Sequence, residues 1–164
     1  MRIELNTYFF DTSAVVRLYT TEPGALHVRN LVRSASMKQA SATVLVCDLA
    51  RPETFAALRK IAMGPDAVRR GLSRAALRQM LPGVRRDFGE QERFFVVPAS
   101  PCMVIAADIA ERHPIKGADA VHIASALVAR DSAPVPDRFF FVSDDAAQSR
   151  VAEAEGLQVL RPAA

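Results

Sequence analysis

The sequence is poor in the residues that build metal–thiolate and redox centres. Its 164 residues include two cysteines, Cys47 and Cys102, and three histidines. The cysteines form no CxxC pair and have no histidine cluster beside them, which disfavours zinc sites and disulfide redox chemistry. Free cysteines are usually buried. We therefore expect two buried free thiols in a reducing compartment.

Long apolar runs are also absent. No stretch approaches the roughly 20 apolar residues of a membrane-spanning helix. The opening MRIELNTYFF lacks the basic start and long apolar run of a secretory signal. There is no internal repeat, low-complexity tract or linker, and half of the residues are hydrophobic. We expect one domain over residues 1–164 with a sizeable core, in the cytoplasm and without membrane association.

Charge of neither sign dominates, since 21 Lys and Arg stand against 18 Asp and Glu and give a net charge of +3. The distribution is less even. Residues 51–93 hold ten basic residues and five acids, whereas the rest of the chain holds eleven and thirteen. Residues 51–93 are therefore a basic segment, and the rest of the chain is mildly acidic.

Strand-like and helix-like segments alternate along the chain. Short apolar runs that end at polar turns predict strands, and amphipathic spacing with proline and serine start signals predicts helices. Pro52 suits a first helical turn, Gly156 suits a helix end, and Pro82 with Gly83 is expected to kink or end a helix. This alternation favours an α/β fold with a mostly parallel sheet. The predicted strands are 7–10, 41–47, 93–100, 137–143 and 157–160, and the predicted helices are 13–20, 24–35, 52–62, 74–81, 101–113, 118–130 and 146–155.

Four acids occupy corresponding places in this pattern. Asp11 and Asp145 follow the C-terminal ends of apolar strands, where the functional crevice of an open α/β sheet lies. Glu53 and Asp119 each sit in the first turn of an apolar helix, where the helix dipole favours a negative charge. Taken singly, each acid has a plain interpretation as a cap or a first-turn charge.

Four carboxylates gathered at one place would repel one another, and their pKa values would rise unless a cation joined them. A ligand set of oxygen atoms alone suits a hard divalent ion, Mg²⁺ or Mn²⁺. The acids together therefore indicate a magnesium or manganese site.

Four segments, in this order, resemble the motifs of the PIN-domain family, and especially the VapC-type ribonuclease toxins of toxin–antitoxin pairs. They are FFDTSAVVRLYTTEPG, ETFAALRK, KGADAVHIASAL and FVSDDAAQSRVAEAEGLQVL. The likeness spans essentially the whole chain. It implies a three-layer α/β/α sandwich with a mostly parallel central sheet.

The resemblance implies that Asp11, Glu53, Asp119 and Asp145 bind the metal, with Asp144 as an alternative to Asp145. It also implies that a hydroxyl after the first acid, from Thr12 or Ser13, holds a metal-bound water. Thr12 and Ser13 have a plain interpretation too, as a helix N-cap. Because Pro52 directly precedes Glu53 and could shift the helix start, Asp48 competes for the second acidic place.

The activity implied by this resemblance is metal-assisted hydrolysis of RNA, in which the cation neutralises charge on the scissile phosphate. The expected fragments carry a 5′-phosphate and a 3′-hydroxyl. The expected partners are RNA, a cognate antitoxin protein and a second copy of the chain, with residues 15–33 as a possible contact surface of a homodimer.

Basic side chains are candidates for RNA contacts. Arg70, Arg74 and Arg78 are four residues apart and would form one stripe on a continuous helix, although most such stripes are solvated faces. His122 follows Asp119 by three residues, so it either orients Asp119, touches substrate or bonds to a neighbour. Phe94 and Phe95 are interpreted as strand core. The predicted RNA-contact set is Arg17, Arg59, Lys60, Arg70, Arg74 and Arg78.

Two other functions stay open at this point. The first is a PIN-like module that binds RNA or protein without cleaving. The second is a phosphohydrolase with Asp11 as nucleophile, in the manner of haloacid dehalogenases. That chemistry usually has a second aspartate two residues later, where this chain has Ser13.

Overall fold

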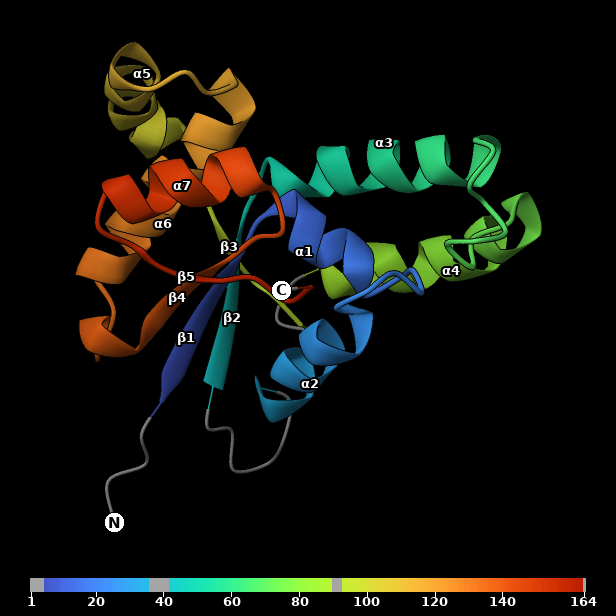
Figure 1. Cartoon of the computed structure of the whole chain (residues 1–164). Coiled ribbons are helices and arrows are strands. Elements are labelled where there is room, and N and C mark those ends of the chain that lie inside the picture. Colours follow the sequence, from blue (N-terminus) through green and yellow to red (C-terminus); the bar gives the residue numbers. More distant parts are fainter. Residues whose placement is uncertain (1–4, 36–41, 90–92, 164) are drawn as a thin grey trace.

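The computed structural model describes residues 5–35, 42–89 and 93–163, and five strands of this part form one sheet (Figure 1). Every pairing in the sheet is parallel, and the strand order is β3-β2-β1-β4-β5. The predicted mostly parallel sheet is thus confirmed. The strands are β1 (Asn6–Phe10), β2 (Ala42–Cys47), β3 (Phe95–Val97), β4 (Phe139–Val142) and β5 (Gln158–Leu160).

Helices cover both faces of the sheet and complete the predicted three-layer α/β/α sandwich (Figure 1). One layer holds α1 (Thr12–Arg17), α2 (Ala25–Ala35), α3 (Ala50–Met63) and α4 (Arg74–Asp87). The other holds α5 (Met103–Arg112), α6 (Gly117–Asp131) and α7 (Ala146–Ala154), with 3₁₀ turns at Ser100–Cys102 and Pro136–Arg138.

Alternation along β1 divides the core in two. Tyr8 and Phe10 face α1 to α4, whereas Phe9 faces α5 to α7. The ring of Phe9 lies 6.3 Å from that of Phe139 and 6.1 Å from that of Phe141, measured between ring centroids. Strands buried on both faces must be apolar throughout, which explains the uninterrupted runs that predicted them.

Helix boundaries agree with several sequence signals. Pro52 lies in the first turn of α3, where its missing N–H removes no helical hydrogen bond. Gly156 follows α7 with a φ of +85°, a conformation that glycine adopts without strain.

Cys47 and Cys102 are both free and buried, as predicted. None of the helices in the described residues has the length and apolar character needed to cross a membrane.

Two local predictions were wrong, and a third was wrong in one of its two alternatives. Of the kink or end expected at Pro82 and Gly83, the end does not occur, because α4 runs on to Asp87 and buries Val84 and the following Phe88 in the core. Phe95 is 64% exposed, since β3 is an edge strand, whereas Phe94 is buried as expected. The helix N-cap at the first acidic motif is Asp11, and Thr12 and Ser13 belong to α1 itself.

Candidate active site

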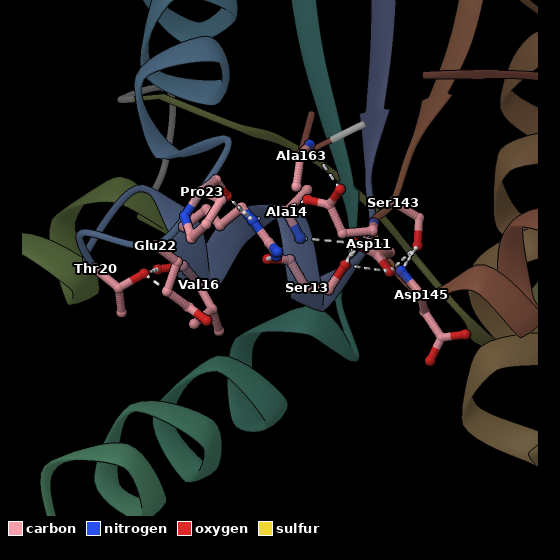
Figure 2. A network of polar contacts seen from close by, with 12 residues as sticks. Asp11, Ser13, Ala14, Val16, Thr20, Glu22, Pro23, Ser143, Asp145 and Ala163 are labelled. Carbon is pink, nitrogen blue, oxygen red and sulfur yellow. Dashed lines mark hydrogen bonds and ion pairs between the residues drawn. The ribbon is translucent and has the colours of Figure 1, made fainter. Parts of the chain in front are cut away.

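Asp11 is at the centre of a dense polar network at the C-terminal end of β1 (Figure 2). Its Oδ1 accepts hydrogen bonds from the Ala14 N–H at 2.8 Å and the Ser13 hydroxyl at 2.7 Å. Its Oδ2 accepts a hydrogen bond from the Ser143 hydroxyl at 2.6 Å. The side chain is buried, and both carboxylate oxygens are held by donors from α1 and from the end of β4.

Burial raises the pKa of Asp11, and the hydrogen bonds from Ser143, Ala14 and Ser13 act in the opposite direction. The donors therefore offset only part of the cost of burying this charge. A positive charge placed nearby would favour the ionised form further.

The second predicted acid, Glu53, reaches across from the first turn of α3 to α1 and α6. Its Oε2 accepts hydrogen bonds from the Thr12 hydroxyl at 2.5 Å and from Nε2 of His122 at 2.7 Å. Burial acts to raise the pKa of Glu53, but the bonds from His122 and Thr12 prevail and lower it. Glu53 is therefore held as a carboxylate.

Asp48, the alternative to Glu53, lies elsewhere. Its Oδ1 accepts a hydrogen bond from the Ala99 N–H at 3.0 Å, which fastens the end of β2 to the segment after β3. The sequence preference for Glu53 over Asp48 at this place agrees with the structure.

Asp119 differs from the other acids because no residue in the described ranges donates a hydrogen bond to its carboxylate. Partial burial raises its pKa, and the negative charges of Asp145 and Glu53 raise it further, against the opposing influence of Lys116 and His122. Asp145 and Glu53 therefore both lie within electrostatic reach of Asp119.

The structure also separates Asp144 from Asp145. Asp144 forms an ion pair with Arg17 at 2.9 Å and accepts a hydrogen bond from the Ala163 N–H, so it faces α1 and the segment after β5. The exposed Asp145 caps α7 through its Oδ1, which accepts bonds from the N–H groups of Ala147 and Gln148. Its charge acts on Asp119, which favours Asp145 as the fourth acid.

Ser13 ties the two sides of this region together. Its hydroxyl donates to Asp11 and accepts a hydrogen bond from the Asp144 N–H at 3.1 Å. In the same turn, the Asp145 N–H donates to the Ser143 hydroxyl, also at 3.1 Å (Figure 2). Hydrogen bonds thus attach the turn between β4 and α7 to the start of α1.

The four acids do not form a closed ligand cage in the part of the chain that the structure describes. Among the residues that the structure describes, no three His, Cys, Asp or Glu side chains stand in an arrangement that could hold a metal ion. The chemistry of the donors nevertheless fits a hard divalent cation, since all four supply oxygen and Asp119 has no donor of its own. Asp11, Glu53, Asp119 and Asp145 would hold such an ion.

The predicted basic residues fall into two groups. Arg17, Lys60 and Arg70 line a cavity of about 470 Å³ that begins at Thr12 and Ser13 and runs between α1, α3 and the following turn. Arg59, Arg74 and Arg78 are exposed on α3 and α4. Both groups belong to the layer of α1 to α4.

The predicted stripe of three arginines does not form. Ser73 caps α4, which begins at Arg74, and Gly71 has a φ of +65°, so Arg70 precedes the helix. Its guanidinium pairs with Glu22 at 2.6 Å. Arg17 is also occupied, because it forms an ion pair with Asp144 and donates hydrogen bonds to the carbonyl oxygens of Pro23 and Ser13. Lys60 is exposed and forms no ion pair within the described part of the chain.

Sequence reasoning missed one contributor. Ser143 donates to Asp11 across 132 residues, and its place directly after an apolar strand was the available signal. For His122, a bond to a neighbour was one of the three alternatives, and the structure shows that this neighbour is Glu53 on another helix. Contacts between distant segments leave no periodic trace in the sequence.

Comparison with known proteins shows the family of the chain. Residues 8–154 match the model of the PIN domain family. Two proteins of Mycobacterium tuberculosis, Ribonuclease VapC45 of strain CDC 1551 / Oshkosh and Ribonuclease VapC49 of strain H37Rv, are each 32% identical to the chain over 155 residues. These alignments cover 90% of this chain and 95% of each relative.

Solved structures show the same fold at low sequence identity. VapBC2 from Rickettsia felis, bound to a DNA fragment from its promoter, aligns with a TM-score of 0.55 at 11% identity, covering 94% of this chain and 98% of that chain. FitAB bound to an IR36 DNA fragment aligns with a TM-score of 0.54 at 15% identity, covering 96% of each chain. The family match over most of the chain, together with the two relatives, shows that this chain belongs to the PIN-domain family and is of the VapC type.

Proposed function

We propose that the chain is an endoribonuclease that depends on Mg²⁺ or Mn²⁺ and acts as the toxin of a toxin–antitoxin pair. The observation that carries this proposal is the Asp119 carboxylate, which is half-buried, lacks a hydrogen-bond donor in the described residues and lies near the charges of Asp145 and Glu53. A divalent cation would relieve this repulsion. The similarity to VapC ribonucleases supports RNA as the substrate.

The four acids have different parts in this proposal. Asp11 and Glu53 are fixed in place by protein donors. Asp119 and Asp145 complete an oxygen-only set suited to Mg²⁺ or Mn²⁺. When bound, such a cation supplies charge neutralisation at the scissile phosphate and a water of lowered pKa. Ser13 and Ser143 keep Asp11 in place.

The basic surface beside this site supports a polyanionic substrate. Lys60 lines the cavity that starts at Thr12 and Ser13, and Arg59, Arg74 and Arg78 are exposed on the same layer. We propose that these four side chains contact the RNA backbone. Arg17 and Arg70 form ion pairs with acids. We therefore propose that they shape the cavity rather than contact the RNA.

We further propose a cognate antitoxin as a protein partner, in keeping with the VapC type of the chain. A homodimer and a cytoplasmic location stay predictions from the sequence.

RNA cleavage in the absence of any partner tests the main proposal. The purified protein is incubated with single-stranded RNA and with transfer RNA in Mg²⁺, in Mn²⁺ and in EDTA. We expect cleavage only with a divalent cation, and a loss of at least about 100-fold in Asp11→Asn and Asp119→Asn, because such enzymes depend on their cation for both charge neutralisation and water activation. Asp108→Asn, which removes an exposed acid of α5, is the matched control.

Cleavage that persists in EDTA or in the Asp119→Asn protein would contradict the proposal. RNA binding without cleavage under every metal would favour the non-catalytic binding module. A phosphorylated Asp11 intermediate would favour the phosphohydrolase.

A further inference from the structure

We infer that His122 and Thr12 are positioning residues for Glu53, which hold its Oε2 so that Oε1 faces the cation. This inference rests on the proposed cation site and assigns how the second acid is oriented within it. It gives a role to a buried histidine that the proposed reaction does not otherwise use.

The geometry of the three side chains carries the inference. Both hydrogen bonds to Glu53 end on one oxygen, with Thr12 Oγ1 at 2.5 Å and His122 Nε2 at 2.7 Å from Oε2. Thr12 Oγ1 and His122 Nε2 are 3.3 Å apart, which closes a triangle around that oxygen. No donor in the described residues reaches Oε1. Two donors on one oxygen fix the carboxylate and leave the other oxygen available.

The three side chains come from three elements, since Thr12 is in α1, Glu53 in α3 and His122 in α6. The two donors therefore approach from both sides of the sheet's carboxyl edge, and they fix the position of Glu53 relative to both helical layers. Glu53 is itself half-buried, and its long side chain would otherwise sample several rotamers. Such outer partners of ligating carboxylates commonly set their orientation.

His122 is placed for this task more than for packing. Its side chain is 2% exposed, and its Nδ1 has no hydrogen-bond partner in the part of the chain that the structure describes. A buried polar atom without a partner costs free energy, which an apolar residue of similar size would avoid. The interaction gained through Nε2 is the one with Glu53.

Paired substitutions separate positioning from packing. His122→Leu fills the space but removes the donor, whereas the terminal amide of His122→Gln reaches about as far as Nε2 and keeps a donor. Thr12→Val removes the hydroxyl at nearly constant shape, and Thr12→Ser keeps it. Binding of Mn²⁺ alone is measured from the electron paramagnetic resonance signal of the free ion, and folding is checked by circular dichroism and thermal unfolding.

We expect His122→Leu and Thr12→Val to weaken Mn²⁺ binding about 10- to 100-fold, in the range typical of lost partners of metal ligands. His122→Gln and Thr12→Ser should stay within about threefold of the unchanged protein, since each keeps its donor. If His122→Leu does not fold, the Thr12 pair alone decides the result.

Glu53→Gln distinguishes failure of this inference from failure of the proposed function. If Glu53→Gln binds Mn²⁺ as the unchanged protein does, the proposed cation site is itself overturned. If Glu53→Gln binds weakly while folded His122→Leu and Thr12→Val bind normally, the cation site stands and the positioning role is overturned. Equal losses in His122→Leu and His122→Gln would also overturn it, because the donor would then not be the cause.

Discussion

At the scale of single residues, the four acids of the site are not equivalent. Asp11 and Glu53 each accept hydrogen bonds from two or more donors, whereas the Asp119 carboxylate accepts none from the described residues. Asp145 uses one oxygen as the cap of α7. Asp11 and Glu53 are fixed by these donors. We expect removal of a charge at Asp119 or Asp145 to have the larger effect on the electrostatics of the site.

Asp119→Asn should stabilise the protein in the absence of divalent cations. Burial and the charge of Asp145 raise the pKa of Asp119, so the folded state binds its proton more tightly than the unfolded state does. The ionised form therefore costs stability, and this cost grows as the pH rises through the raised pKa. Since Asp119 is half-exposed and screened, we expect a Tm gain of about 1 to 2 °C at pH 7.

Thermal unfolding in EDTA between pH 7 and pH 4.5 checks this result. The gain should shrink as the pH falls, because the unchanged protein then carries the proton that neutralises Asp119. Asp108→Asn should show no such trend. A gain that is constant with pH, or a loss of stability, would contradict the assigned cause.

Asp144→Asn and Asp145→Asn should have opposite profiles. Asp144→Asn weakens an ion pair whose two side chains are 8% and 15% exposed, so we expect a loss of roughly 1 to 3 kcal/mol in stability. Its effect on Mn²⁺ binding should be small. Asp145→Asn should weaken Mn²⁺ binding more and cost less stability, since asparagine also caps helices well. Urea unfolding and Mn²⁺ titration of both variants measure the two effects, and a reversed order would make Asp144 the fourth acid.

Residue types predicted this site better than residue contacts did. Asp11 and Asp145 were recognisable because parallel strands end at one edge of the sheet, and their places are as expected. The pairing of Glu53 with His122 joins helices 69 positions apart, so no local pattern encodes it. The distinction between Asp144 and Asp145 depends on the direction of two adjacent side chains, which the sequence leaves open.

At the scale of elements, a turn after α3 is fastened to the connection between α1 and α2. The Thr21 N–H donates to the Arg70 carbonyl at 3.1 Å, and Glu22 pairs with the Arg70 side chain. Gly71 follows with a φ of +65°, and a Cβ there would meet the Thr21 side chain at 2.8 Å. Glu22 and Arg70, the paired residues beside this contact, line the cavity that begins at Thr12 and Ser13.

Gly71→Ala should therefore destabilise the protein by at least roughly 1 to 2 kcal/mol, the usual cost of a left-handed conformation for a residue with a Cβ. Gly83→Ala is the matched control. Gly83 lies inside α4, and its added Cβ would meet only the end of Arg86 at 3.9 Å. The same change should there stabilise by about 0.5 to 1 kcal/mol. Urea unfolding of both variants compares the signs, and a neutral Gly71→Ala would show that the turn adapts.

Residues that typically start or end helices predicted the helix boundaries well, except where tertiary packing determined the outcome. Pro82 was expected to kink or end a helix, yet α4 continues and Val84 and Phe88 beyond it are buried in the core, and their burial outweighs the lost backbone hydrogen bond. The expected arginine stripe failed because the positive φ of Gly71 and the cap at Ser73 place Arg70 before the helix. The sequence shows Gly71 and Ser73 but does not show that the backbone has a positive φ at Gly71.

At the scale of the whole molecule, charge is distributed by layer. The exposed basic residues Arg59, Lys60, Arg74 and Arg78 belong to α3 and α4, which extend away from the sheet together (Figure 1). Each phosphate contact with single-stranded RNA contributes about 0.7 to the slope of log affinity against log salt concentration. This distribution therefore has a measurable signature.

The double variant Arg74→Ala, Arg78→Ala should lower that slope by about 1.4 and weaken binding at low salt. Thermal stability should change little, because both side chains are exposed. The control, Arg112→Ala with Arg150→Ala, removes the same charge from α5 and α7. Fluorescence anisotropy with a labelled RNA oligonucleotide at several salt concentrations measures both slopes. Equal slopes for the two double variants would show that RNA does not follow the α3–α4 surface.

The hydrogen bond between Ser143 and Asp11 spans 132 residues and has a consequence for synthesis of the chain. The carboxylate pocket needs the start of α1 and the turn after β4, so a ribosome must translate past Ser143 before the two can meet. A nascent chain that ends before Ser143 therefore carries Asp11 and Glu53 without this pocket. The order of translation thus delays formation of the site by the synthesis of at least 132 residues after Asp11.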